Sequence, residues 1–212
     1  VTVKLDVAAY WKDPRMKDMW QKRDVKLTER GNLWAPNIHV VNADELEVNL
    51  ESLRLINRGV FATWVGFAAM GLAESLTYMP EDHPDRARVL VKFVALMEAM
   101  RRHQEPSGMW RQVVDFPGTY QEFTATSMTG YAMARGVRMG WLDKSFRDTV
   151  ALAWQGISER IEDSGKVVDA CFGSGTNATV QYYLDRPAVS GFDDRGGSMA
   201  LWFTAEVLML RR

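Results

Sequence analysis

Cysteine, histidine and uninterrupted hydrophobic stretches are scarce in this 212-residue chain, and each shortage excludes a class of protein. The single cysteine, Cys171, excludes an internal disulfide and a cysteine-rich metal site. The three histidines are scattered without metal-ligand spacing, so we expect no metal site. The longest apolar segment, residues 60–79, is interrupted by polar and small residues. It is therefore predicted to be a core helix and not a membrane span.

Neither positive nor negative charge is in excess, since the chain contains 26 Lys and Arg residues and 27 Asp and Glu residues. This balance argues against a nucleic-acid-binding surface, and no charged run indicates a tail. We expect one globular domain over residues 1–212, with an irregular segment (1–43) followed by helical hairpins (44–212). No signal peptide is visible, and the start resembles that of a truncated chain. The sequence does not decide between cytoplasm and periplasm.

Five predicted helices alternate between apolar and amphipathic sequences. Residues 60–79, 122–139 and 196–210 are apolar or small nearly all round, which favours inner helices. Residues 86–104 and 145–161 each have one apolar face, which favours outer helices. A Ser-Gly turn followed by Val-Val-Asp begins at Ser107 and recurs 57 residues later at Ser164. This repeat and the alternation predict an all-α protein, the C-terminal part of an α/α toroid.

Three loop blocks precede the predicted inner helices, at residues 57–59, 110–122 and 192–197. Because the inner helices of a toroid share one rim, we expect these blocks to face a common cleft. Helix N-termini attract anionic groups, and the Trp, Arg and Glu side chains of the second block suit a sugar ring that carries a carboxylate. The same residues also occur in ordinary helix connectors with a solvated face. The residues alone leave both interpretations open.

A set of motifs carries a family resemblance. They lie at residues 78–84, 108–115, 120–128, 136–143 and 163–167, with a glycine-rich helix start near Gly196. In this order they resemble the unsaturated glycuronyl hydrolases, glycoside hydrolase families 88 and 105, and more closely the rhamnogalacturonyl branch, family 105. The resemblance implies a six-hairpin α/α barrel without a cofactor. It also implies substrates that are oligosaccharides ending in a 4,5-unsaturated uronic acid.

The resemblance further implies a set of substrate-binding residues, which are Arg58, Trp64, Trp110, Arg111, Glu122, Thr124 and His39. The family's Arg-Gly-Asn-Gly-Trp signature is altered around Arg58 and Trp64. The family's catalytic aspartate lies in a Trp-x-Asp motif that should fall before Val1, so the catalytic residue is unknown. Residues 141–143 imitate this motif, but Asp143 is predicted to cap the following helix.

Two alternatives to a hydrolase stay open. The missing aspartate favours a non-catalytic carbohydrate-binding or scaffold half-toroid. A lyase or epimerase on the same barrel, with Tyr or His as the base, is the third hypothesis. An open half-ring would expose the apolar flanks of its terminal inner helices, so closure by a second copy or by a partner chain is expected. The expected partners are an oligosaccharide substrate and either a second copy of this chain or another chain that completes the barrel. We expect no binding to nucleic acid or to a membrane.

Overall fold

The computed structural model describes residues 34–35, 38–39, 62–173 and 180–211. The chain divides into two compact units, Val1–Ser52 and Leu53–Arg212. In the first unit, strand β1 (Trp34–Ala35) pairs with β2 (Ile38–His39) in an antiparallel ladder. All the other described elements belong to the second unit, which contains the candidate site.

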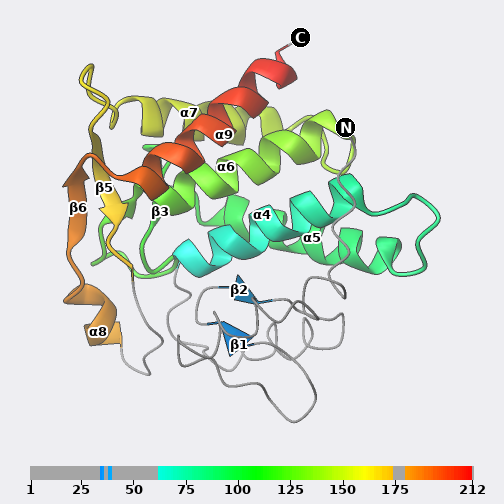
Figure 1. Ribbon diagram of the computed structural model, residues 1–212, viewed down its shortest axis with the longest axis horizontal. Helices are drawn as coiled ribbons and strands as arrows, with labels where there is room; N and C mark the ends of the chain where they lie inside the picture. Colours follow the sequence, from blue (N-terminus) through cyan, green and yellow to red (C-terminus); the bar gives the residue numbers. More distant parts are fainter. Residues whose placement is uncertain (1–33, 36–37, 40–61, 174–179, 212) are drawn as a thin grey trace, which may run out of the picture. The chain divides into compact units, whose positions relative to one another are not determined.

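The second unit is mostly helical, as Figure 1 shows. Its helices are α4 (Ala62–Tyr78), α5 (Arg86–Arg102), α6 (Phe123–Arg138), α7 (Phe146–Ser158), α8 (Val180–Leu184) and α9 (Asp194–Leu210). Its strands form two antiparallel pairs, β3 (Trp110–Arg111) with β4 (Gln121–Glu122) and β5 (Val167–Cys171) with β6 (Ala188–Gly191). The predicted helical architecture is confirmed, and short strands replace part of the expected loops.

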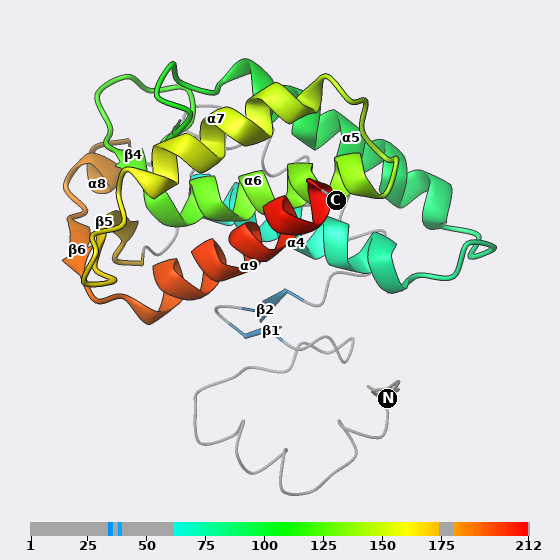
Figure 2. The same cartoon turned by 90° about the horizontal axis from the view of Figure 1, so that it is seen from above.

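Helix α6 is the buried centre of this unit, because all its residues except Arg135 and Arg138 are buried. Helices α4 and α9 pack along the two sides of α6. Helices α5 and α7 lie on the side of the unit that is opposite to α4 and α9 (Figure 2). Figures 1 and 2 both show α4, α6 and α9 running in one direction and α5 and α7 running in the other. The predicted alternation of inner and outer helices is therefore present over the described residues.

Close approach of α6 and α9 depends on a glycine. A methyl group at Gly130 would lie 2.4 Å from the Phe203 ring of α9, a distance that no side chain can occupy. The Phe203 ring also meets Trp154 of α7 edge-on, with ring centroids 5.8 Å apart. Phe203 thus joins α9 to both an inner and an outer helix.

The repeated Ser-Gly turn has the same backbone conformation in both copies. Gly108 has φ +84° and Gly165 has φ +85°, values in the left-handed region that favours glycine. The first turn leads into β3 and the second into β5. The glycine turn therefore recurs in the structure, whereas Val-Val-Asp follows β3 in the first copy and lies within β5 in the second.

Helices α4 and α9 are less covered than their apolar sequences predict. Phe67 of α4 is 54% exposed and Leu201 of α9 is 70% exposed. Each helix packs on α6 along one side, and the described part of the chain supplies no fourth inner helix for the other side. This exposure matches the apolar flanks expected of an open half-ring.

Candidate functional site

Glu122 joins the start of α6 to strand β5. It is the N-cap of α6, with an extended backbone. Its fully buried carboxylate accepts the backbone N–H groups of Thr124 at 2.7 Å, Ala125 at 2.5 Å and Cys171 at 2.9 Å. A carboxylate in this position is favoured by the positive end of the helix dipole. We call residues 105–123, 167–173 and 193–197, which surround this contact, the rim.

Helix α9 also begins at the rim. Asp193 caps it, with Oδ1 accepting the Gly196 N–H at 2.6 Å. A methyl group at Gly196 would lie 3.3 Å from both Ala170 of β5 and Phe123 of α6, so the first turn of α9 packs directly on these elements. The N-termini of α6 and α9 therefore open on one rim. Two of the three predicted loop blocks are brought together, and the third lies outside the described residues.

Arg111 and Trp110 of β3 have contrasting environments. Arg111 forms a two-point ion pair with Glu105, with both N–O distances at 3.0 Å, and donates to the Thr119 carbonyl at 2.7 Å. Its side chain stays partly exposed at the rim. Trp110 is fully buried, and its Nε1 donates to the Met100 carbonyl at 2.7 Å. Trp110 is thus a core residue in this structure, and its contact with a sugar stays a prediction.

A phenol and a strained aspartate lie near Glu122. Asp169 has φ +61°, a value that residues other than glycine rarely adopt, where β5 bulges between Val167 and Ala170. Burial raises the pKa of Tyr120, and the negative charges of Glu122 and Asp169 raise it further. Tyr120 is therefore a neutral phenol at neutral pH. Backbone strain at a polar residue occurs preferentially at functional sites.

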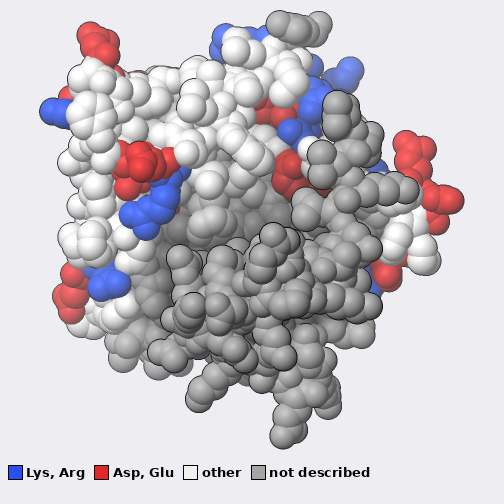
Figure 3. Space-filling view, viewed as in Figure 1, with Lys and Arg blue, Asp and Glu red and all other residues white. Residues whose placement is uncertain are grey.

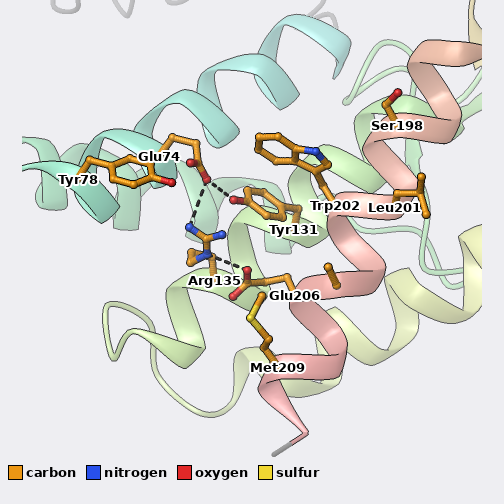
Figure 4. Close-up of a pocket in the computed structure, with 10 residues that line it drawn as sticks. Glu74, Tyr78, Tyr131, Arg135, Ser198, Leu201, Trp202, Glu206 and Met209 are labelled. Carbon is orange, nitrogen blue, oxygen red and sulfur yellow. Dashed lines mark hydrogen bonds and ion pairs between the residues drawn. The ribbon is translucent and has the colours of Figure 1, made fainter. Parts of the chain in front are cut away.

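A groove of about 450 Å³ lies between α4 and α9, with α6 as its floor (Figure 4). It is lined by Glu74, Tyr78, Tyr131, Arg135, Ser198, Leu201, Trp202, Ala205, Glu206 and Met209. The Trp202 and Tyr131 rings are in contact, with centroids 5.5 Å apart. The groove therefore combines aromatic and aliphatic walls with a charged floor.

Four charged side chains, Glu74, Arg135, Arg138 and Glu206, form what we call the ion cluster, and all of them except Arg138 line the groove. Arg135 donates to Glu206 at 2.8 Å, to Glu74 at 3.3 Å and to the Thr77 hydroxyl at 2.9 Å. Arg138 pairs with the other oxygen of the fully buried Glu206 carboxylate. Burial lowers the pKa of Arg135, but the hydrogen bond and charge of Glu206 outweigh it, so this pKa is raised. The ion cluster links α4, α6 and α9.

None of the sequence motifs contains Glu74 or Glu206, so these two residues are not predicted as part of a site. Their signal in the sequence is an acidic residue inside an otherwise apolar helix, at residues 60–79 and 196–210. A charge on such a helix is seldom fully buried unless it is paired. Each of these residues therefore calls for a cationic partner on a neighbouring helix.

We expect Tyr131→Phe to make the protein less sensitive to alkali. The Tyr131 hydroxyl donates to Glu74, and burial, followed by this hydrogen bond, raises its pKa above 10.0. A raised pKa in the folded state stabilises the protein below the pH at which the unfolded tyrosine ionises, and this stabilisation is lost above it. The free energy of unfolding in urea should therefore fall less steeply in the variant between neutral pH and pH of about 11.

The exposed Tyr78 provides the matched control for this prediction, since Tyr78→Phe removes a hydroxyl from the same groove. This control should keep the alkaline sensitivity of the unmodified chain. Equal pH dependence of Tyr131→Phe and the unmodified chain would contradict the prediction.

The remaining predicted site residues belong to different elements. Thr124 is buried in the first turn of α6, His39 lies in β2 of the first unit, and Trp64 lies in the first turn of α4. Arg58 lies outside the described residues. Among the described residues no three His, Cys, Asp or Glu side chains gather as metal ligands. No helix in the described ranges has both the length and the hydrophobicity to cross a bilayer.

Residues 62–211 match the sequence profile of Glycosyl Hydrolase Family 88. The matched span contains the rim and the groove. It also covers all the motifs that carry the resemblance in the sequence, so that resemblance is confirmed.

The chain covers different fractions of the length of two curated relatives. A 24.9 kDa protein in the picA locus of Rhizobium radiobacter is 28% identical over 173 residues, which is 72% of this chain and 73% of that protein. The unsaturated rhamnogalacturonyl hydrolase YesR of Bacillus subtilis is 24% identical over 149 residues, which is 69% of this chain. The match covers 41% of the length of that hydrolase.

A solved structure agrees with the fold. The crystal structure of a possible member of glycoside hydrolase family 105 from Klebsiella pneumoniae matches with a TM-score of 0.68 at 18% identity. The match covers 96% of this chain and 66% of that one. It supports the helical architecture as part of a larger one. Given the profile match over most of its length, the chain belongs to glycosyl hydrolase family 88.

Proposed function

We propose that the chain forms part of a glycoside hydrolase that acts on oligosaccharides with a terminal 4,5-unsaturated uronic acid. The family match over residues 62–211 carries this proposal. The similarity to YesR, named as an unsaturated rhamnogalacturonyl hydrolase, supports the substrate class. The N-termini of α6 and α9 at the rim already hold the carboxylates of Glu122 and Asp193, so the support from the rim comes from the partly exposed guanidinium of Arg111.

The proposed reaction is the hydration of a vinyl ether. A carboxylic acid gives its proton to carbon C4 of the double bond, water adds at C5 and loses a proton, and the hemiketal opens with loss of the glycosidic bond. The acid has to be protonated near neutral pH, and burial achieves this by disfavouring the anion. Ordinary glycoside hydrolysis differs, because there two carboxyl groups flank the scissile bond at the anomeric carbon.

The rim residues divide into proposed contact and positioning roles. Arg111 is partly exposed, and the guanidinium N–H groups that do not contact Glu105 or the Thr119 carbonyl suit it to bind the uronate carboxylate. Glu122 and Trp110 are buried, so in this proposal they hold the rim in shape. The other proposed contacts rest on the resemblance alone, and they are Arg58, Trp64, Thr124 and His39.

The catalytic acid is not assigned to any described residue. Asp143 ends the tripeptide 141–143, which resembles the family's Trp-x-Asp motif. Its side chain is exposed and accepts the Ser145 N–H at 2.8 Å. This backbone hydrogen bond lowers the pKa of Asp143, so its carboxylate is an anion at neutral pH and does not suit a proton donor. Asp143 is therefore not assigned as the acid, and a non-catalytic carbohydrate-binding half-toroid is the second candidate.

An absorbance assay separates the two candidates. Hydration destroys the conjugated enol ether of an unsaturated rhamnogalacturonan disaccharide, so turnover removes its ultraviolet absorbance. We expect the chain to remove this absorbance and Asp143→Asn to leave the rate unchanged. Binding without turnover, measured by calorimetry, would contradict a hydrolase whose acid lies within these 212 residues and would support the half-toroid. Absence of both binding and turnover would contradict both candidates.

The same assay tests the role of Arg111. Arg111→Ala should raise KM about tenfold, since a hydrogen bond to a charged group contributes about 1.5 kcal/mol or more. Glu105→Ala is the matched control, because it removes the same loop ion pair and keeps the guanidinium. An equal rise of KM in both variants would mean that Arg111 only fastens the loop.

A further inference from the structure

Strand β5 contains a bulge in the part of it that belongs to the rim. Two of its residues, Val168 and Asp169, oppose the single residue Ser190 of β6. Both are half-buried, so the alternation of buried and exposed residues along the strand is interrupted here. The backbone N–H of Asp169 donates to the Ser190 hydroxyl at 3.3 Å. A bulge changes the direction of a side chain, and bulges are frequent next to active sites.

Asp169 is an uncommon residue for this bulge. In the part of the chain that the structure describes, it is the only residue other than glycine with a positive φ, +61°. Glycine is the ordinary residue at such a position, because it has no Cβ that would crowd the backbone. Aspartate adopts this conformation more often than most residues, but at a cost that glycine does not have. The backbone therefore does not explain why this residue carries a carboxylate.

The packing of the rim does not explain this carboxylate either. No hydrogen bond or ion pair within the described ranges engages the side-chain oxygens of Asp169, which is half-buried. The rim carboxylates of Glu122 and Asp193 differ, since each of them caps a helix by accepting backbone N–H groups. The oxygens of Asp169 are therefore available to a ligand at the rim.

Asp169 lies near the residue to which the proposed function assigns the uronate carboxylate. Burial raises the pKa of Tyr120, and nearby negative charges, among them that of Asp169, raise it further. Tyr120 follows Thr119, whose carbonyl accepts a hydrogen bond from Arg111 at 2.7 Å. Asp169 and Arg111 thus border the same segment of the rim. Figure 3 shows acidic and basic side chains together at the end of the unit that carries β5, β6 and the start of α9.

We propose that Asp169 is a specificity-determining residue that accepts a hydrogen bond from a hydroxyl group of the bound oligosaccharide. An ionised carboxylate has acceptor oxygens and no donor, so it matches a sugar O–H group and not an ether or carbonyl oxygen. The guanidinium of Arg111 has only donors and matches the carboxylate of the uronic acid. The two side chains together fix the orientation of the sugar. This inference rests on the proposed function, which brings the sugar to Arg111.

Two substitutions of the same residue separate binding from folding. Asp169→Gly removes the carboxylate and relieves the positive φ, whereas Asp169→Ala removes the carboxylate and keeps the crowded backbone. The urea midpoint of Asp169→Gly should equal or exceed that of the unmodified chain, and that of Asp169→Ala should be lower. Both variants should bind an unsaturated rhamnogalacturonan disaccharide about tenfold more weakly in calorimetry, because a hydrogen bond to a charged group is lost.

The matched control is Asp163→Gly. Asp163 is exposed in the turn before β5, outside the rim, and its φ is not positive. This variant should bind the disaccharide as the unmodified chain does, and its urea midpoint should not rise, since glycine there relieves no backbone crowding. Full affinity of Asp169→Gly and Asp169→Ala would overturn the proposal.

Disaccharides that each lack one hydroxyl group identify the contact. One of them should bind the unmodified chain about tenfold more weakly than the parent sugar does. Asp169→Gly should bind that analogue and the parent sugar equally, because the hydrogen bond is already absent from this variant. Losses that simply add to that of Asp169→Gly for every analogue would overturn the proposal.

Turnover is measured separately on the same samples. Binding that depends on Asp169 without turnover would contradict a hydrolase whose acid lies within these 212 residues and leave the role of Asp169 intact. Turnover with an unchanged KM in Asp169→Gly would overturn the role of Asp169 and leave the proposed function intact. Absence of binding to the unmodified chain would contradict both.

Discussion

Glu206→Ala is expected to lower the free energy of unfolding by about 3 kcal/mol, because it leaves a largely buried charge without its main partner. The Glu206 side chain has no exposed surface, and it pairs with both Arg135 and Arg138. Arg135 is 12% exposed, and its remaining partners would be Glu74, at the longer distance of 3.3 Å, and the uncharged Thr77 hydroxyl. Urea unfolding at neutral pH measures this change.

The exposed Glu98 on α5 is the matched control for this prediction, since Glu98→Ala removes the same group from a solvated position. That control should change the unfolding free energy by no more than about 0.5 kcal/mol. Glu206→Gln, which keeps the shape of the side chain, should fall between the two. Equal stability of Glu206→Ala and Glu98→Ala would show that the ion cluster does not hold the three inner helices together.

Glu122→Ala is expected to cost about 3 kcal/mol or more, because three buried backbone donors lose their acceptor. These are the N–H groups of Thr124, Ala125 and Cys171. Their amide hydrogens should exchange faster in the variant, which measures the loosening of α6 and β5 directly. The loss should exceed the cost of about 1 kcal/mol that is typical of an N-cap.

Asp193 supplies the comparison, since its side chain caps α9 through a single N–H, that of Gly196. Asp193→Ala should therefore cost about 1 kcal/mol, the value expected of one cap. The amide of Cys171 should remain protected in this variant. A similar loss from both variants would contradict the role of Glu122 as the link between α6 and β5.

The helices could be predicted because the spacing of apolar residues in the sequence indicates which face of each helix is buried. The predicted helix at residues 145–161 is observed as Phe146–Ser158, and Val150 and Ile157 are buried as the spacing indicates. The two-residue strands β3 and β4 have no period to detect. The expected capping by Asp143 is present as a hydrogen bond, since its carboxylate accepts the Ser145 N–H, although the helix boundary places the N-cap at Ser145, which makes no side-chain cap hydrogen bond.

The candidate site could be predicted only in part, because burial at the rim depends on distant segments. Glu122 lies at the start of α6 as expected, yet its carboxylate is enclosed by Cys171, which is 49 residues further along the chain. Arg135 and Glu206 of the ion cluster are 71 residues apart. Local spacing carries no information on such pairs, so the motifs locate the rim but not its contacts.

Turnover in heavy water tests the proposed hydration chemistry most directly. In the proposed reaction C4 takes its new hydrogen from a carboxylic acid that exchanges with solvent. The product released from an unsaturated rhamnogalacturonan disaccharide should therefore carry one deuterium at C4 and no C4 to C5 double bond, as read by proton NMR and mass spectrometry. Release of a sugar that keeps the double bond and carries no deuterium at C4 would contradict the account.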